Sequence, residues 1–159
     1  MPDVFIGAGS NANPERALRR AADELERQFG AIRCSNVYRS AADGARAADY
    51  LNLVVAVETD RTVDSVREAL RAIEVLAGRT RANRAVVELD LDLLAYGWCV
   101  DASRRLPRPG LFTTPFVLGP LAELAPQFVH PVTGERCRPA WIAADNGELR
   151  DVGALTALG

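Results

Sequence analysis

Apolar and polar positions in the first third of the chain follow a strand period and then a helix period. Residues 4–6 form a short apolar run that leads into a glycine-rich stretch, which predicts a strand entering a loop. Asn13 and Pro14 are typical of the N-cap and first position of a helix. Apolar residues then recur at helical spacing up to Phe29, and Gly30 is expected to end the helix.

The same two periods return in the next sixty residues. Extended runs are expected over 32–38 and 50–58, and Thr62 is expected to cap a second helix that Gly78 closes. The predicted buried face of that helix consists of Val66, Leu70, Ile73 and Leu76. A last strand is expected over 86–96. The order β-α-β-β-α-β predicts an α+β fold, a ferredoxin-like sandwich with helices on one face of an antiparallel sheet.

The pattern weakens after Gly97, where prolines punctuate the chain. One short helix is expected near 115–124. No linker separates this additional C-terminal segment, so residues 1–159 are expected to form a single domain with the segment packed on it. Residues 138–159 carry few landmarks beyond Trp141, and their role stays open.

The predicted strand at 86–96 carries the strongest chemical signal. Three leucines alternate there with Glu88, Asp90 and Asp92, which places the leucines on one face and the carboxylates on the other. Oxygen ligands at this spacing suit a hard cation such as Mg²⁺, which takes one or two protein carboxylates and completes its shell with water and phosphate. The alternative is a solvated outer face of an antiparallel strand.

Arginines flank the acidic strand on both sides. Arg79, Arg81 and Arg84 precede it, and Arg104, Arg105 and Arg108 follow it. A metal-binding carboxylate pair with several guanidinium groups is what polyphosphate binding requires. Pairing with the acidic strand or exposure to water is the alternative. The chain contains no lysine, which excludes a Walker-type phosphate loop and leaves arginine as the phosphate ligand.

Composition removes several other classes of function. The net charge of −2 does not suggest a nucleic-acid or membrane-surface partner. No secretory signal or membrane span is indicated, so a cytoplasmic protein is expected. The three cysteines indicate neither a disulfide framework nor a zinc site. His130 is the single histidine, which makes a catalytic triad or multi-histidine metal site implausible and favours a structural role.

Several segments together resemble a known family over residues 1 to about 135. They are Phe5-Ile6-Gly7-Ala8-Gly9-Ser10-Asn11, Tyr38-Arg39-Ser40, Asp49-Tyr50-Leu51-Asn52, Ile73-Glu74, Gly78-Arg79-Thr80-Arg81, Leu89-Asp90-Leu91-Asp92-Leu93-Leu94-Ala95-Tyr96-Gly97 and Phe116-Val117-Leu118-Gly119-Pro120-Leu121-Ala122-Glu123-Leu124-Ala125-Pro126. The chain resembles the 6-hydroxymethyl-7,8-dihydropterin pyrophosphokinases of the folate pathway. The resemblance implies ATP, two Mg²⁺ ions, and transfer of the β,γ-diphosphate of ATP to the substrate hydroxymethyl oxygen with release of AMP.

The resemblance also implies roles for individual residues. Asp90 and Asp92 match the two metal-binding aspartates, and Arg79 and Arg81 match arginines of the catalytic loop. The residues implied to bind the pterin are Ser40, Tyr50, Asn52 and Phe116. The residues implied to bind ATP are Glu74, Arg79, Arg81, Arg84 and Arg108.

Three stretches depart from the family pattern. Asn83-Arg84-Ala85-Val86-Val87 stands where the family reads Arg-Trp-Gly-Pro-Arg, and Pro107-Arg108-Pro109 replaces Pro-His-Pro. Thr114 falls where a later arginine is usual, and the substrate-side loop after Ser40 is shortened. The metal pair and much of the pterin wall are therefore expected to remain, while the ATP clamp is remodelled.

Three functions follow from this combination. The first is the pterin pyrophosphokinase itself. The second is a paralogue that diphosphorylates another hydroxymethyl heterocycle, of the methanopterin or methylofuran type. The third is a non-catalytic pterin- or nucleotide-binding protein. The oligomeric state, monomer or weak dimer, is left open.

Overall fold

The computed structural model describes residues 1–40, 49–78 and 87–158. The strands within these ranges are β1 Asp3–Ser10, β2 Ile32–Cys34, β3 Val37–Ser40, β4 Tyr50–Glu58, β5 Asp90–Tyr96 and β6 Arg150–Gly153. The helices are α1 Pro14–Phe29, α2 Val63–Leu76, α3 Pro115–Leu124 and α4 Cys137–Ala144, with short 3₁₀ turns η1 Ala102–Arg104 and η2 Leu155–Ala157.

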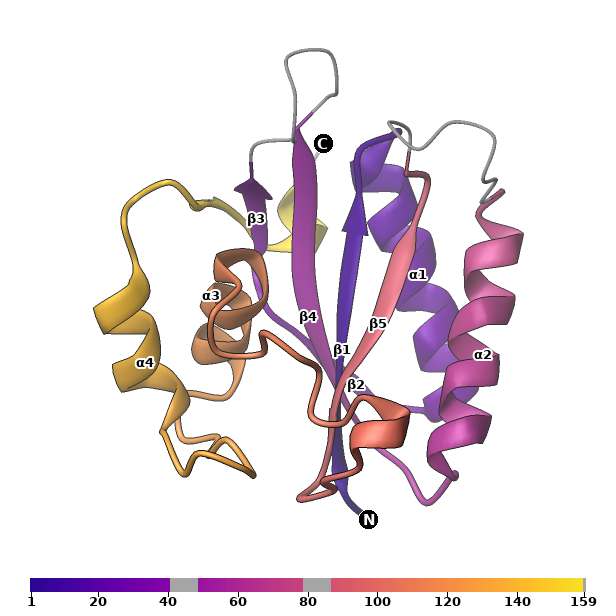
Figure 1. The fold of residues 1–159 in the computed structure, drawn as a ribbon. Coiled ribbons are helices and arrows are strands. Elements are labelled where there is room, and N and C mark those ends of the chain that lie inside the picture. Colours follow the sequence, from indigo (N-terminus) through magenta and orange to yellow (C-terminus); the bar gives the residue numbers. More distant parts are fainter. Residues whose placement is uncertain (41–48, 79–86, 159) are drawn as a thin grey trace.

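One antiparallel sheet organises the molecule (Figure 1). Its order is β5-β1-β4-β3-β6, and β2 pairs with β4 as an earlier stretch of the strand that continues as β3. Ser35 separates the two stretches because its buried hydroxyl accepts a hydrogen bond from the Val54 amide at 2.9 Å. The first five strands and two helices confirm the predicted ferredoxin-like α+β topology.

Helices cover both faces of the sheet: the two helices of the predicted core lie on one face, and the helix expected near 115–124 lies on the other. Helices α1 and α2 pack on one side, and α3 lies on the other with α4 outside it (Figure 1). Helix α3 is apolar almost all round, because it is held between the sheet and α4. The C-terminal segment is therefore part of the packed structure, through α4 and through β6 on the edge of β3.

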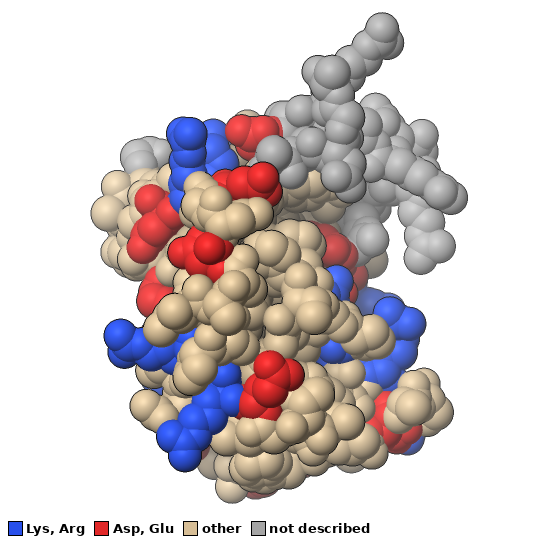
Figure 2. All heavy atoms as spheres, turned by 60° about the vertical axis from the view of Figure 1, so that its left-hand side comes forward, with Lys and Arg blue, Asp and Glu red and all other residues tan. Residues whose placement is uncertain are grey.

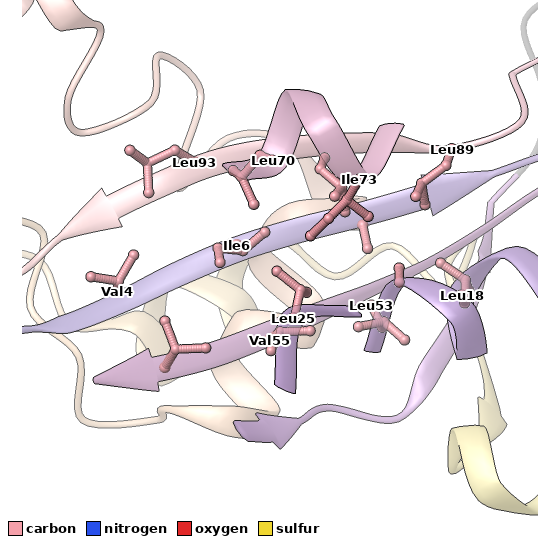
Figure 3. Packing of buried hydrophobic residues seen from close by; sticks show 14 of the residues in the cluster. Val4, Ile6, Leu18, Leu25, Leu53, Val55, Leu70, Ile73, Leu89 and Leu93 are labelled. Atoms are coloured by element: carbon pink, nitrogen blue, oxygen red, sulfur yellow. The ribbon is translucent and has the colours of Figure 1, made fainter. Parts of the chain in front are cut away.

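The face under α1 and α2 is filled by branched aliphatic side chains (Figure 3). Val4, Ile6 and Ala8 of β1 alternate toward this face, as do Leu91 and Leu93 of β5. Leu25 of α1 is fully buried among them. Leu76 was predicted to belong to this face, but it is 53% exposed, whereas the adjacent Ala77 packs against the core.

The predicted helix starts are confirmed, but strand bounds differ: β1 continues through Gly7–Ser10, where a loop was expected, and the run expected over 32–38 extends to Ser40. Asn13 precedes α1, but its backbone is left-handed and its side chain makes no capping hydrogen bond. Thr62 caps α2 as predicted, accepting from the Ser65 amide at 3.1 Å. Strand β5 begins at Asp90 rather than at residue 86.

The side of the molecule that carries α3 and α4 shows scattered charges rather than a patch of one sign (Figure 2). Most of its visible surface is uncharged, with red and blue groups interspersed. None of the helices over the described residues is both long and apolar enough to cross a bilayer.

Candidate active site

A cavity of about 320 Å³ opens on the α3 side of the sheet, which we call the slot. Strands β1, β3, β4 and β5 contribute to it together with the first turn of α3. Its lining includes all four residues predicted to bind substrate, Ser40, Tyr50, Asn52 and Phe116, and both predicted metal ligands, Asp90 and Asp92. A mostly apolar hollow with a few polar groups is the usual form of a small-molecule site.

The slot exists because β1 has almost no side chains on this face. Phe5 fills the space below α3, but Gly7 and Gly9 follow it at the next positions on the same face. A Cβ atom at Gly9 would stand 2.8 Å from Asn52 Oδ1. The glycine therefore permits the amide of Asn52 to lie directly against the backbone of the neighbouring strand.

The amide of Asn52 is held in one orientation. Its Nδ2 group donates a hydrogen bond to Ser40 Oγ at 2.8 Å, while Oδ1 faces Gly9. Asn52 is only 6% exposed, so a polar group is fixed at the buried end of the slot. The slot also has an aromatic wall, since Phe116 in the first turn of α3 is 40% exposed. Together these groups suit a flat heterocycle with hydrogen-bonding edges.

The carboxylates of β5 face the slot while the leucines beside them face α1 and α2. Leu89, Leu91 and Leu93 are buried, and Asp90 and Asp92 are half-buried, which confirms the predicted alternation. Glu88 does not line the slot; its Oε2 atom is buried without a hydrogen-bond partner among the described residues. The predicted row of three carboxylates is thus a pair at the site.

A second cavity, of about 380 Å³, lies between α2, β5 and residues 103–108; we call it the arginine cleft. Its cationic side chains are Arg67, Arg71, Arg104, Arg105 and Arg108. Glu74 also lines it, is 9% exposed, and accepts a hydrogen bond from the Leu91 amide at 3.0 Å. The carboxylate of Glu74 therefore serves the α2–β5 junction, and the lining of the cleft is otherwise rich in positive charge.

Asp92 lines both the slot and the arginine cleft. Its Oδ2 atom lies 3.5 Å from Nε of Arg108. Arg108, predicted as a nucleotide ligand, therefore lies beside the acidic strand. Pairing with that strand was one of the two interpretations of the flanking arginines. A carboxylate between a flat apolar slot and a cationic cleft is placed to contact a group shared by two ligands.

The arginines of the cleft differ in the ion pairs and hydrogen bonds that they make within the protein. Arg104 pairs with Asp64 at 3.3 Å and with Asp101 at 3.0 Å, and Arg67 donates to the Arg104 carbonyl. The Ser103 hydroxyl and the Arg104 guanidinium lower the pKa of Asp101 to about 2. These contacts attach η1 to α2. Arg71 and Arg105 form no ion pair with any described residue.

Some site residues were missed and others cannot be placed. Arg67 and Arg71 could have been found from the sequence, because they lie seven and three positions before Glu74 and so share its helix face. The role of Gly7 and Gly9 as the floor of the slot has no single-sequence signal apart from the glycines themselves. Arg79, Arg81 and Arg84 lie outside the described residues.

His130 and the cysteines lie away from both cavities. The Nδ1 atom of His130 accepts hydrogen bonds from the amides of Val132 and Thr133 at 3.1 and 3.2 Å, and its ring packs edge-on against Phe112. Burial lowers the pKa of His130. These contacts agree with the structural role expected for it, and no cysteine is disulfide-bonded.

The fold and the two cavities define a ferredoxin-like α+β protein in which a largely apolar cavity adjoins an arginine-rich one. Comparisons with known proteins agree. The family model of 7,8-dihydro-6-hydroxymethylpterin-pyrophosphokinase matches residues 5–126. The chain belongs to this family.

Two relatives are each named 2-amino-4-hydroxy-6-hydroxymethyldihydropteridine pyrophosphokinase. The protein from Synechocystis is 35% identical, and the match covers 92% of this chain and 83% of the relative. The protein from Methylorubrum extorquens is 34% identical, with 96% and 99% covered.

A solved structure supports the fold. The crystal structure of Plasmodium falciparum HPPK-DHPS A437G with pteroate superposes with a TM-score of 0.72 at 12% identity. The match covers 89% of this chain, which spans only 43% of that longer one. At this identity the likeness concerns the fold alone.

Proposed function

We propose that the chain transfers the β,γ-diphosphate of ATP to the hydroxymethyl oxygen of 6-hydroxymethyl-7,8-dihydropterin and releases AMP, as a step of folate-type cofactor biosynthesis in the cytoplasm. The observation that carries the proposal is the position of Asp92 on the walls of both the slot and the arginine cleft. Family membership and the names of the two relatives support the identity of both substrates.

In this proposal the slot binds the pterin. Phe116 stacks on the ring system, and Tyr50 of β4 adds a second aromatic side chain to the lining. Asn52 and Ser40 bind the polar edge of the ring, and the hydrogen bond between them fixes which atoms face the ligand. A site built to pair with heterocycle nitrogen and oxygen atoms rejects analogues that lack them, since its own buried polar groups would then be unsatisfied.

The arginine cleft binds the triphosphate. Arg108 is the described member predicted from the sequence, and Arg79, Arg81 and Arg84 are assigned to the same task from the resemblance. Guanidinium groups bind phosphate oxygens in a forked geometry and stabilise the charge that spreads over them during transfer. Glu74 keeps α2 against β5, so that the floor of the cleft keeps its shape.

Asp90 and Asp92 fit a magnesium site. Both are half-buried oxygen donors on one face of β5; Asp90 lines the slot, and Asp92 lines both cavities. No group of three or more potential metal ligands comes together among the described residues, which suits an ion that draws its remaining ligands from water and phosphate. When bound, Mg²⁺ supplies charge neutralisation and orientation of phosphate oxygens; we propose two such ions.

The reaction forms one bond and breaks another. The hydroxymethyl oxygen attacks the β-phosphorus, the bond from that phosphorus to the oxygen bridging the α-phosphorus breaks, and AMP leaves with that oxygen. The hydroxyl proton is released to solvent. The protein contributes position and electrostatic stabilisation, so no covalent enzyme intermediate is needed.

Detection of AMP tests the proposal. The protein is incubated with ATP, Mg²⁺ and 6-hydroxymethyl-7,8-dihydropterin, and separately with hydroxymethyl heterocycles of the methanopterin and methylofuran types. AMP formed with the pterin alone supports the proposal. Preferential turnover of another heterocycle would identify a diverged paralogue, and binding without AMP formation would identify a non-catalytic protein.

A further inference from the structure

Helix α3 is joined to the sheet by a carboxylate at the opposite end from the slot. Glu123 lies in its last turn, whereas Phe116 lies in its first turn and lines the slot. Both carboxylate oxygens of Glu123 accept the amide N–H of Asn36 at 3.0 Å, and Oε1 also accepts the hydroxyl of Tyr38 at 2.7 Å. Hydrogen bonds to an ionised acceptor are about twice as strong as neutral ones.

The strand that Glu123 contacts is itself a wall of the slot. Tyr38 pairs with Asn52 in the sheet, and Ser40, two residues on, pairs with Tyr50. The side chains at 38 and 40 point to the same face. Glu123 therefore joins α3 to the strand whose next residue on that face holds the amide of Asn52.

The C-terminal segment supports the same junction from outside. Leu149 and Trp141 approach Gly119 so closely that a Cβ atom there would lie 2.6 and 3.1 Å from their side chains. Asn36 Nδ2 donates to Asp151 Oδ2 at 3.1 Å, and β6 pairs with β3. Helix α3 is thus confined between sheet and C-terminal segment, and Glu123 is the charged contact that fixes it along β3.

We propose that Glu123 is a positioning residue for the slot: by joining α3 to β3 it sets the separation between the Phe116 wall and the Ser40–Asn52 wall, and so the affinity for the flat substrate. The proposal rests on the function proposed above, since it assigns that substrate to the slot. Glu123 does not line either cavity, so it acts through Phe116 and Ser40.

The Tyr38 hydroxyl stays protonated beside Glu123. Tyr38 is 8% exposed, and burial, the hydrogen bond to Glu123 and the nearby charges of Glu123 and Asp151 all raise its pKa far above the usual range. Its hydroxyl is consequently always a donor at neutral pH. An amide at position 123 would place an NH₂ group against the Asn36 N–H or the Tyr38 hydroxyl, two donors that the carboxylate satisfies together.

Binding measurements on Glu123→Gln and Tyr38→Phe test the proposal, with Glu148→Gln as the control. Glu148 is exposed, and its side chain makes no recorded contact with α3 or β3. Isothermal calorimetry gives the dissociation constant of the pterin in the presence of Mg²⁺ and a non-hydrolysable ATP analogue, and that of the analogue alone. Thermal unfolding reports the folded fraction.

We expect Glu123→Gln to weaken pterin binding by about 3-fold to 30-fold, the range of substitutions that act on a site through packed contacts. Analogue binding should stay within about twofold, because the arginine cleft is built from other elements. Tyr38→Phe should weaken pterin binding less, and adding it to Glu123→Gln should cost less than it does alone, as contacting residues are not additive. Glu148→Gln should bind like the parent protein.

Two results would overturn the inference while the proposed function stands. One is parent-like pterin affinity in Glu123→Gln with only a lower unfolding temperature, which would make the contact structural. The other is an equal loss of affinity for pterin and nucleotide analogue. If the parent protein itself binds no pterin, the proposed function fails, and the inference fails with it.

Discussion

The same strands form a closed core on one face of the sheet and a cavity on the other. Toward α1 and α2, β1 presents Val4, Ile6 and Ala8, and the result is a closed aliphatic core. Toward α3, the alternate positions of β1 are Phe5, Gly7 and Gly9, and the result is a core at one end and a slot at the other.

Strand β5 repeats the contrast. Its leucines at 89, 91 and 93 face the closed side, and Asp90 and Asp92 face the slot. The difference shows how a single sheet separates stability from binding, because each strand assigns one residue parity to packing and the other to ligand contact. Substitutions on the face toward α1 and α2 should therefore change the free energy of unfolding. Substitutions at the slot should change the binding or turnover of substrate.

The largest effect is expected at Asp92 on the slot side. Asp92→Asn removes the charge shared by both cavities and leaves Arg108 without its partner. Loss of a metal-binding charge removes several kcal/mol of transition-state stabilisation, so kcat should fall by about 10³-fold or more. Steady-state AMP formation measures it, with the remote Asp145→Asn as a control of unchanged activity. A decrease of less than tenfold would exclude Asp92 from the chemistry.

The next effect belongs to the closed face. Leu25→Ala empties a fully buried position and should lower the free energy of unfolding by about 2–5 kcal/mol. The dissociation constant of the pterin should stay unchanged wherever the variant is folded. Chemical denaturation measures the first quantity and calorimetry the second. Leu76→Ala, at an exposed position of α2, should change stability by about 0.5 kcal/mol or less.

A smaller effect on binding is expected at the floor of the slot. In Gly9→Ala the added methyl group would meet Asn52 Oδ1 at 2.8 Å, so the amide must move and its hydrogen bond to Ser40 weakens. Pterin affinity should decrease by about 10-fold or more, the cost of a lost buried hydrogen bond. Gly7→Ala is the comparison, because its methyl group would meet Leu94 at an ordinary 3.4 Å and leave Asn52 in place. Equal affinities of the two variants would contradict the role of Asn52.

The smallest expected effect is a pH dependence of stability that comes from His130, on the α3 side of the sheet. The pKa of His130 is lowered by burial, so folding favours its neutral form and the stability it contributes is present above the unfolded pKa. That contribution should be lost as pH falls from about 6.5 toward the lower folded pKa, because protonated Nδ1 cannot accept the amides of Val132 and Thr133. We expect the parent protein to lose at most a few degrees of unfolding temperature over this window. His130→Asn keeps an acceptor that does not titrate and should flatten the profile; an unchanged profile would refute the assignment.

Periodicity predicted the elements whose burial is one-sided. The helix after Pro14 and the alternation of β5 follow from residues that face either the core or a more open side. The strand at 50–58 was predicted from its continuous apolar centre, and it is buried on both faces. Glu74 of α2 and the predicted pterin ligands Ser40, Tyr50, Asn52 and Phe116 came from the resemblance, because a single residue in a helix or strand has no periodic signal.

The errors have physical causes as well. Leu76 lies three positions after the buried Ile73, at the edge of the helical stripe, and Ala77, four positions after Ile73, packs against the core in its place. Strand β6 was not predicted, because Arg-Asp-Val-Gly has little apolar alternation and is held by backbone pairing with β3. The helix at 115–124 was predicted but not the face that it covers: α3 is apolar almost all round, and such a helix shows that it is buried without showing between which layers.

Strand β6 has a consequence beyond the binding of substrate. Its pairing occupies backbone groups of β3 that would otherwise form an open margin of the sheet, a template on which a strand of another molecule could add. The short, polar strand protects the protein from this form of aggregation. A chain shortened before Arg150 would accordingly be expected to lose solubility, and to do so even under conditions in which the aspartates of β5 remain correctly placed.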